Sequence, residues 1–124
     1  MSETRIQLGL EGEHLAERFL KKRGLKTLAR RFRTPVGEID LVMREGETIV
    51  FVEVKTQSDR AFTDPEARVT LPKQRKLLKA AKWFLTRKRW TDKPCRFDVI
   101  GVIIPPTGDP QIEHFPDAFV PERW

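Results

Sequence analysis

Charged residues interrupt two strand-like segments near the middle of the chain. The stretch 37–55 reads GEIDLVMREGETIVFVEVK and contains two β-branched runs, IDLVM and TIVFVEV. Glu38 and Asp40 interrupt the hydrophobic alternation of the first run, and Glu53 and Lys55 interrupt the second. Carboxylates can hold a hard divalent cation, and a lysine beside them can orient or polarise a water molecule. The stretch therefore holds the groups for hydrolytic chemistry, provided that the fold brings them together.

A short turn between the two runs predicts how they pair. Gly46 and Glu47 fit a two-residue hairpin loop that starts with glycine. This register places Asp40 opposite Glu53, and side-chain alternation then assigns every residue to a face. One face is expected to carry Glu38, Asp40, Val42, Phe51, Glu53 and Lys55, and the other, purely core, to carry Ile39, Leu41, Met43, Val50, Val52 and Val54.

Two opposed carboxylates would repel each other across the strand pair. This repulsion costs up to roughly 1 kcal/mol, and burial adds to the cost. A divalent cation would relieve it, and Mg²⁺ or Mn²⁺ bound by Asp40 and Glu53 suits the donor set. Lys55 lies two positions from Glu53 and so on the same side of the sheet. The interpretation of these residues as a functional site is favoured over a strand face that only alternates charges in solvent.

The rest of the chain predicts the elements that position these groups. Apolar spacing predicts a helix over residues 8–23 with Gly24 as its C-terminal cap, and a second helix over residues 72–89 opened by Pro72. Strands are expected at 25–33, 96–104 and 112–115, with a turn at 34–37 and a long polar loop at 58–72. The order of elements predicts one α/β domain over residues 1–124, a mixed β-sheet flanked by helices.

The composition indicates the cellular compartment of the protein and the class of partner that it binds. Of 124 residues 39% are hydrophobic and 34% are charged, and the single cysteine has no partner for an internal disulfide. No apolar run approaches the roughly 20 residues of a membrane span, and the N-terminal residues lack the apolar core of a secretion signal. A cytoplasmic protein with no membrane partner is expected. The net charge of +6 favours a polyanion such as DNA.

The second helix carries a basic surface with aromatic residues between the cations. Lysines and arginines can meet phosphates there while indoles meet bases or sugars. Alternatively, Trp83 and Trp90 pack beneath the C-terminal tail, and the sequence does not separate the two readings. Lys73 lies in the first turn on the inward side, where it could reach the acidic site or a nearby phosphate. The predicted nucleic-acid-binding residues are Lys73, Arg75, Lys76, Lys79, Lys82 and Trp83.

Both histidines have ordinary explanations. His14 and Glu17 have the i, i+3 spacing of metal ligands, but no further ligand is evident, so a solvent-facing position is expected for His14. His114 is expected to face solvent from a short terminal strand.

The combination and order of these segments resemble a known group of nucleases. Asp40 with Glu53-Val54-Lys55 resembles the motif of the PD-(D/E)XK, restriction-endonuclease-like superfamily, although Ile39 stands at the proline position. More closely, GLEGEHLAERFLKKRGL, GEIDLV, VFVEVK and RFDVIGV, in that order, resemble the bacterial YraN family of predicted endonucleases, which are related to archaeal Holliday-junction resolvases. The resemblance covers nearly the whole chain.

This resemblance implies a function and one further residue. It implies a restriction-endonuclease-like fold and a metal-dependent endonuclease that hydrolyses DNA phosphodiesters, with branched or repair intermediates as candidate substrates. It also implies that Glu13 completes the metal site of Asp40 and Glu53 or acts as a base beside Lys55. A helical wheel permits this by placing Glu13 at the border of the apolar stripe. Junction cleavage would need two sites, which favours a homodimer. The alternatives are a DNA-binding module that does not cut and a scaffold that meets protein or RNA.

Overall fold

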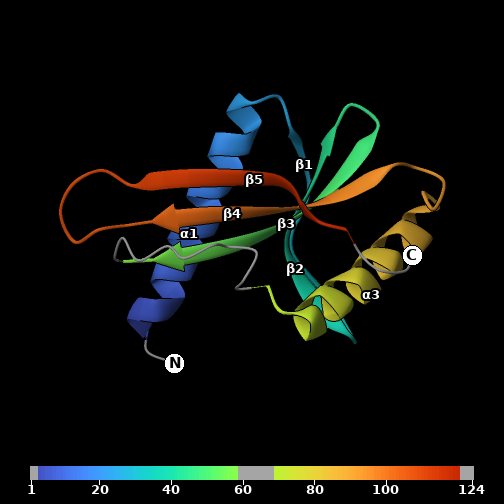
Figure 1. Ribbon diagram of the computed structural model, residues 1–124, viewed down its shortest axis with the longest axis horizontal. Coiled ribbons are helices and arrows are strands. Elements are labelled where there is room, and N and C mark those ends of the chain that lie inside the picture. Colours follow the sequence, from blue (N-terminus) through green and yellow to red (C-terminus); the bar gives the residue numbers. More distant parts are fainter. Residues whose placement is uncertain (1–2, 59–68, 121–124) are drawn as a thin grey trace.

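Five strands form one mixed sheet in the computed structural model, which describes residues 3–58 and 69–120 (Figure 1). The strand order is β1-β2-β3-β4-β5. Adjacent strands run antiparallel except β3 and β4, which are parallel. The elements are α1 (Glu3–Lys22), β1 (Lys26–Thr34), β2 (Gly37–Glu45), β3 (Thr48–Gln57), α3 (Leu71–Lys88), β4 (Cys95–Ile103) and β5 (Gln111–Phe119).

The predicted mixed α/β architecture is confirmed. Within the described ranges, two long helices pack against the five-stranded sheet, an arrangement consistent with a restriction-endonuclease-like fold. The parallel pair β3 and β4 needs a crossover connection, and α3 provides it. Most of the polar loop expected at 58–72 lies outside the described residues. Strand β5 is longer than the four residues expected, because it continues through Phe119.

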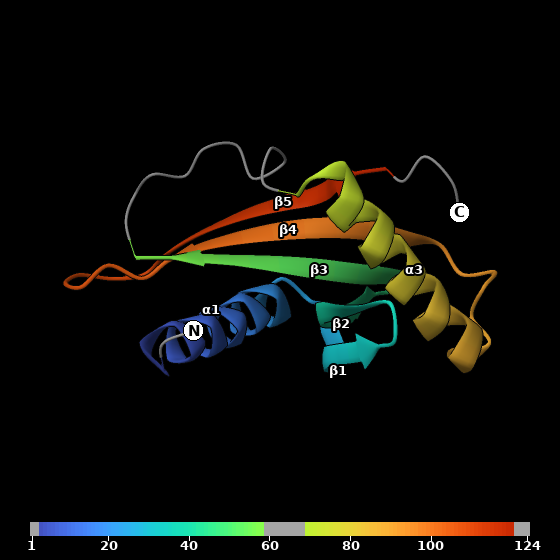
Figure 2. The same cartoon turned by 90° about the horizontal axis from the view of Figure 1, so that it is seen from below.

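The two helices cover opposite faces of the sheet (Figure 2). On one face Leu77, Ala81 and Phe84 of α3 pack against Phe51 of β3. On the other face Ala16 and Leu20 of α1 pack against a second cluster. That second cluster includes Leu41, Met43, Val50, Val52, Ile100 and Val102.

The expectation that only one face of the β2–β3 pair is core is therefore wrong. Val42 and Phe51, assigned to the chemical face, are fully buried beneath α3. Ile39, assigned to the other face with Leu41, also joins the α3 cluster. The cause is local: Arg31 of β1 lies between the residues that pair with Ile39 and Leu41, and its φ is +47°. A regular pleat cannot continue through such a residue, so simple alternation fails there.

Helix α1 lies unusually close to β3. A Cβ added to buried Gly12 would stand 1.9 Å from Oγ1 of Thr56, a distance that no real side chain tolerates. The helix begins at Glu3 rather than Leu8, and it ends as predicted beside Gly24, whose φ of +96° suits the residue that follows a helix. Helix α1 thereby holds its buried acid, Glu17, against β1.

Helix α3 begins where the candidate site lies. Its N-cap is Thr70, whose hydroxyl accepts a hydrogen bond from the backbone N–H of Lys73 at 3.4 Å, and Pro72 occupies the first turn. Arg89, with φ +59°, ends the helix in the left-handed conformation. The helix therefore begins and ends one residue earlier than predicted. The N-cap fixes its first turn beside β3.

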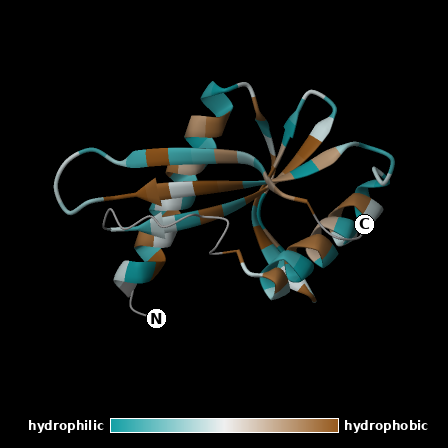
Figure 3. Ribbon diagram, viewed as in Figure 1, coloured by the Kyte–Doolittle hydropathy of each residue, from teal (hydrophilic) through white to brown (hydrophobic). Residues whose placement is uncertain are grey.

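Hydrophobic residues gather on the middle strands and on one side of α3, whereas the loop between β4 and β5 is hydrophilic (Figure 3). No helix within residues 3–58 and 69–120 is long and apolar enough to cross a membrane.

Candidate active site

The predicted turn register is confirmed. Gly46, with φ +59°, begins the turn, and Glu45 pairs with Thr48 across it. The ladder continues pair by pair to Leu41 and Val52. The printed pairing of the two strands ends there, and Asp40 and Glu53 are the next residues of β2 and β3 away from the turn.

The side chain of Asp40 binds β3 just beyond the last backbone pair between β2 and β3. Its Oδ2 accepts a hydrogen bond of 2.8 Å from the backbone N–H of Val54. A side chain thus satisfies a group that would otherwise bond a backbone carbonyl of β2. The carboxylate is tied to β3, next to Glu53.

The environment of Asp40 opposes its ionisation. Burial and the nearby negative charge of Glu53 raise the pKa of Asp40 to about 7, and the hydrogen bond from Val54 only partly offsets them. Glu13 adds repulsion, and Lys73 adds a weaker opposing attraction. Asp40 is therefore a strongly perturbed acid in a cleft, which is typical of functional sites.

Two lysines compete for one oxygen of Glu53. The Nζ atom of Lys73 lies 2.8 Å from Oε1 of Glu53, and Nζ of Lys55 lies 3.6 Å from the same atom. The carboxylate itself is buried, with 6% of the residue exposed. Burial and the neighbouring ammonium of Lys73 lower the pKa of Lys55. Burial alone would lower the pKa of Lys73 also, but attraction to Glu53 outweighs it and raises that pKa.

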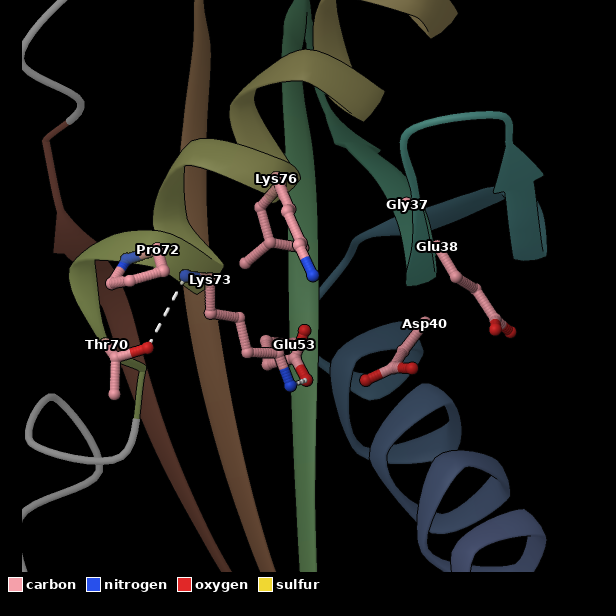
Figure 4. Close-up of a pocket in the computed structure, with 9 residues that line it drawn as sticks. Gly37, Glu38, Asp40, Glu53, Thr70, Pro72, Lys73 and Lys76 are labelled. Atoms are coloured by element: carbon pink, nitrogen blue, oxygen red, sulfur yellow. Dashed lines mark hydrogen bonds and ion pairs between the residues drawn. The ribbon is translucent and has the colours of Figure 1, made fainter.

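Asp40, Glu53 and Lys73 line an open cavity of about 440 Å³ between the start of α3 and the β2–β3 pair, whereas Lys55 is not among its lining residues. Figure 4 shows the side chains of Lys73 and Asp40 converging on Glu53, while Glu38 extends away from it. Glu38 is exposed, and its Oε1 lies 3.9 Å from Nε of Arg33. The lining residues are Gly37, Glu38, Asp40, Glu53, Thr70, Pro72, Lys73, Lys76 and Leu77.

Glu13 lies at the edge of this arrangement. Its Oε1 accepts a hydrogen bond of 3.0 Å from Nε of Arg31, the residue with the unusual φ. Its charge reaches Asp40, as the pKa shift of that residue shows. Among residues 3–58 and 69–120, however, no three His, Cys, Asp or Glu side chains stand close enough to hold a metal ion together. The structure joins Asp40 with Glu53 and leaves Glu13 engaged with Arg31.

The predicted nucleic-acid-binding residues lie on the outer surface of α3. Trp83 is 39% exposed, and Arg75, Lys76, Lys79 and Lys82 are also exposed. Lys73 is the exception, because it turns inward to Glu53.

Trp90 does not belong to this surface. Its ring packs edge-on against Phe84 at 6.1 Å, and Lys88 and Lys93 lie over it. The two tryptophans therefore separate, one exposed and the other packed against the core. The alternative prediction placed the tail, residues 117–124, over both rings, and the described part of the chain includes that tail only as far as residue 120.

Sequence reasoning missed a buried polar cluster on β4 and β5. Asp98 is fully buried and binds Arg96 through both oxygens, at 2.9 and 3.2 Å. It also accepts a 2.9 Å hydrogen bond from the backbone N–H of Asp117 and lies 2.8 Å from Nε2 of His114. The signal was present, because Asp98 is the one acid inside an otherwise apolar strand.

The solvent-facing prediction for His114 is wrong. Only 5% of its side chain is exposed, and Nδ1 accepts a hydrogen bond of 3.1 Å from Arg23. A guanidinium can only donate, so the ring proton lies on Nε2, which donates to Asp98. Burial opposes ionisation of Asp98, but His114, Arg96 and the Asp117 N–H outweigh it and lower the pKa.

Glu17 is a second buried acid, and its charge is stabilised by hydrogen-bond donors. It accepts hydrogen bonds from Thr27 at 2.6 Å and from Nε of Arg30 at 2.8 Å. Burial alone would raise its pKa, but these bonds lower the pKa to about 2. Glu17 is engaged in this way, and His14 is exposed, as predicted.

The donor set of the cavity fits a hard divalent cation. Asp40 and Glu53 present carboxylate oxygens at adjacent positions, and the unfavourable charge on Asp40 is the observation that a cation would relieve. Cys and His, the ligands typical of structural zinc sites, do not line the cavity. The arrangement can therefore bind an anionic substrate through lysines and a cation through carboxylates.

Comparison with known proteins shows the family of the chain. Residues 12–102 match the model of the Uncharacterised protein family UPF0102. A UPF0102 protein of Geotalea daltonii is 47% identical over 112 residues, covering 90% of this chain and 88% of the relative. Similar proteins occur in Geobacter metallireducens, 47% identical over 96% of this chain and 97% of the relative, and in Syntrophotalea carbinolica, 42% identical over the full length of both. The chain therefore belongs to the UPF0102 family.

Proposed function

We propose that this protein is a metal-dependent endonuclease of the PD-(D/E)XK type that hydrolyses phosphodiester bonds of DNA. The observation that carries the proposal is the arrangement around Glu53: Asp40 on the adjacent strand and two lysines at one carboxylate oxygen. The resemblance of the motif order to the YraN family of predicted endonucleases supports the same reaction. The open cavity gives a phosphate access to these groups.

Each residue has a chemical role in this proposal. Asp40 and Glu53 would hold Mg²⁺ or Mn²⁺, which when bound supplies charge neutralisation and lowers the pKa of water. Lys55, whose pKa is lowered, would orient and polarise the attacking water. Lys73 would leave Glu53 for a phosphate oxygen of the substrate. Glu13 would hold Arg31 in place and add to the negative potential at Asp40.

The proposed DNA contacts follow from position and charge. Lys76 stands on the rim of the cavity, and Arg75, Lys79 and Lys82 extend the positive surface along α3. Counterion release would make binding fall steeply with salt. Cleavage of a branched substrate at two positions would require two copies of the chain, and we propose a homodimer for that case.

Cleavage assays test the enzyme directly. The protein is incubated with branched, single-stranded and duplex DNA in Mg²⁺ or Mn²⁺, beside Glu53→Gln and Lys55→Met. We expect both variants to lose at least about a hundredfold in rate, the scale of a removed charge-stabilising or proton-transferring group. Glu113→Gln, which changes an exposed acid on β5, is the matched control and should cleave normally. Equal rates for Glu53→Gln and wild type would rule out the site.

A non-cutting DNA-binding module is the second candidate, and one observation favours it. Lys73 already neutralises Glu53 at 2.8 Å, and Glu38, the third acid that lines the cavity, is exposed and extends away from Glu53 (Figure 4). Such a protein would bind DNA equally well in EDTA and in Mg²⁺, with no products in either. Product formation that depends on metal and on Glu53 decides for the nuclease.

A further inference from the structure

A second groove lies further along α3, on the side of the helix that faces solvent. Its volume is about 550 Å³, within the range of small-molecule sites. The groove is bounded by α3 and by the tip of the β1–β2 hairpin. Its lining residues are Val36, Lys79, Lys82, Trp83, Thr86 and Arg87.

The floor of this groove is apolar and exposed. Trp83 is 39% exposed and Val36 is 40% exposed, whereas most large apolar side chains of the described residues are buried. Within the described part of the chain the Trp83 indole stacks on no other ring and meets no cation, in contrast to Trp90. An exposed indole beside a branched aliphatic side chain offers a flat apolar surface for another planar group.

The rim of the groove is cationic. Lys79, Lys82 and Arg87 are exposed, and none of them forms an ion pair with another described residue. No acidic residue is among the lining residues. An occupant that combines a planar apolar group with negative charge complements this surface, and a nucleotide is such a group. A second copy of the chain is disfavoured, because a two-fold contact would bring the same cations together.

The groove is placed in line with the candidate active site. Lys76, on the rim of the first cavity, and Trp83 are seven residues apart on one face of α3. At 1.5 Å per residue this is about 10 Å along the helix. That distance equals about three nucleotides of a strand that keeps the 3.4 Å spacing of stacked bases. Val36 and Gly37 of the hairpin tip likewise line the two cavities side by side.

From these observations we propose that the groove beside Trp83 stacks an unpaired nucleobase, so that the protein selects DNA with unpaired nucleotides about three positions from the phosphate it presents to Glu53. This inference rests on the proposed function for its choice of DNA. Bases inside a continuous duplex cannot lie flat on the indole, since both of their faces are already stacked. A single-stranded overhang, a flap or a junction with unpaired bases can supply one.

Binding measured in EDTA tests the inference separately from cleavage. Three labelled DNAs are compared by fluorescence anisotropy: a duplex with a single-stranded overhang, the same duplex with abasic sites in the overhang, and a blunt duplex. For Trp83→Ala we expect affinity for the first DNA to fall about 5- to 100-fold, the range of one stacked base. Affinity for the other two should change by less than about twofold.

Two further variants guard against indirect effects. Trp83→Phe keeps an aromatic face and should recover part of the lost affinity. Ile6→Ala removes another exposed apolar side chain, on α1, and should bind all three DNAs as wild type does. Because Trp83 is exposed, circular dichroism should show all variants folded.

Several outcomes would overturn the inference. An equal loss on blunt and overhanging duplexes would show that the groove contacts only phosphates. A change in oligomeric state of Trp83→Ala without DNA would assign the groove to a second copy. Stronger quenching of Trp83 fluorescence by polyglutamate than by the overhang would assign it to an acidic peptide. Absence of binding to every DNA would overturn the proposed function as well, whereas binding without base dependence overturns this inference alone.

Discussion

Asp98 and Asp40 are both acids within the sheet, yet their surroundings differ in one decisive way. Asp98 meets Arg96, His114 and a backbone N–H, and these partners lower its pKa. Asp40 has one backbone N–H and faces Glu53, and its pKa rises to about 7. The first acid is matched by its own chain, and the second is not. The difference teaches that the unmatched acid marks the candidate site, because natural proteins keep such unfavourable charges mainly where function uses them.

The largest expected effect separates the two acids by stability. Asp98→Asn removes the buried counter-charge of Arg96, which keeps only the more exposed Glu45 at 2.9 Å, and should lose at least about 3 kcal/mol of unfolding free energy. Asp40→Asn keeps an oxygen for the Val54 N–H while removing repulsion from Glu53, so its stability should equal or exceed that of wild type. Urea denaturation in EDTA measures both. A greater loss for Asp40→Asn than for Asp98→Asn would reverse the comparison.

The two acids should also give opposite pH profiles. The folded-state pKa of Asp40 is raised, so the native state binds the extra proton and stability falls as pH rises from about 4 to about 7. Relative to Asp40→Asn, wild type should lose on the order of 3–4 kcal/mol across this window, since one pKa unit is worth about 1.4 kcal/mol.

Asp98 and Glu17 have lowered pKa values, so the stability that they contribute is lost as pH falls below their ordinary values near 4. Urea titrations of wild type and Asp40→Asn from pH 4 to pH 8 measure the difference. Parallel curves for the two proteins would mean that Asp40 is not perturbed.

Metal binding should follow the unmatched acid. At a Mn²⁺ concentration ten times Kd, wild type should gain about 1.4 kcal/mol, because the ion binds only the folded state. The gain should be greater at pH 8 than at pH 6, where a proton competes for Asp40. Asp40→Asn and Glu53→Gln should gain little. Thermal melts measure the shifts, and equal shifts in wild type and Asp40→Asn would exclude Asp40 as a ligand.

The smallest expected effect concerns Lys73, whose ammonium group pairs with Glu53. Lys73→Met should change stability by about 1 kcal/mol or less, because the lysine is partly exposed and its ion pair is screened. It should nevertheless strengthen Mn²⁺ binding severalfold, since Lys73 competes for Oε1 of Glu53. The control is Lys76→Met, which removes an exposed lysine three residues further along α3. Calorimetric titration measures both, and weaker Mn²⁺ binding by Lys73→Met would contradict the competition.

Local patterns predicted the parts of the site that depend on neighbours in sequence. The Gly46 turn set the register of β2 and β3, and this register was confirmed as far as Leu41 and Val52. Alternation failed at Ile39, because the irregularity lies in Arg31 on the partner strand, which the sequence of β2 does not reveal.

Contacts distant in sequence were harder to predict. His114 meets Asp98 only through the register of β5 on β4, and Lys73 meets Glu53 only because the Thr70 cap fixes the start of α3. Trp83 and Trp90 look alike on the helical wheel, but the left-handed residue Arg89 ends the helix before Trp90. The chain direction changes there, so the second ring turns back onto Phe84.

The bond between Asp40 and the Val54 N–H gives the site an internal reporter. Most amide protons of a sheet point to backbone carbonyls, whose charge never changes. The Val54 amide points instead to an oxygen whose proton occupancy changes near neutral pH. Its nuclear magnetic resonance signal should therefore follow the ionisation of one carboxylate, and the arrival of a cation there, without any label in the cavity. The Val54 amide of β3 thus reports directly whether the Asp40 carboxyl in the cavity is charged.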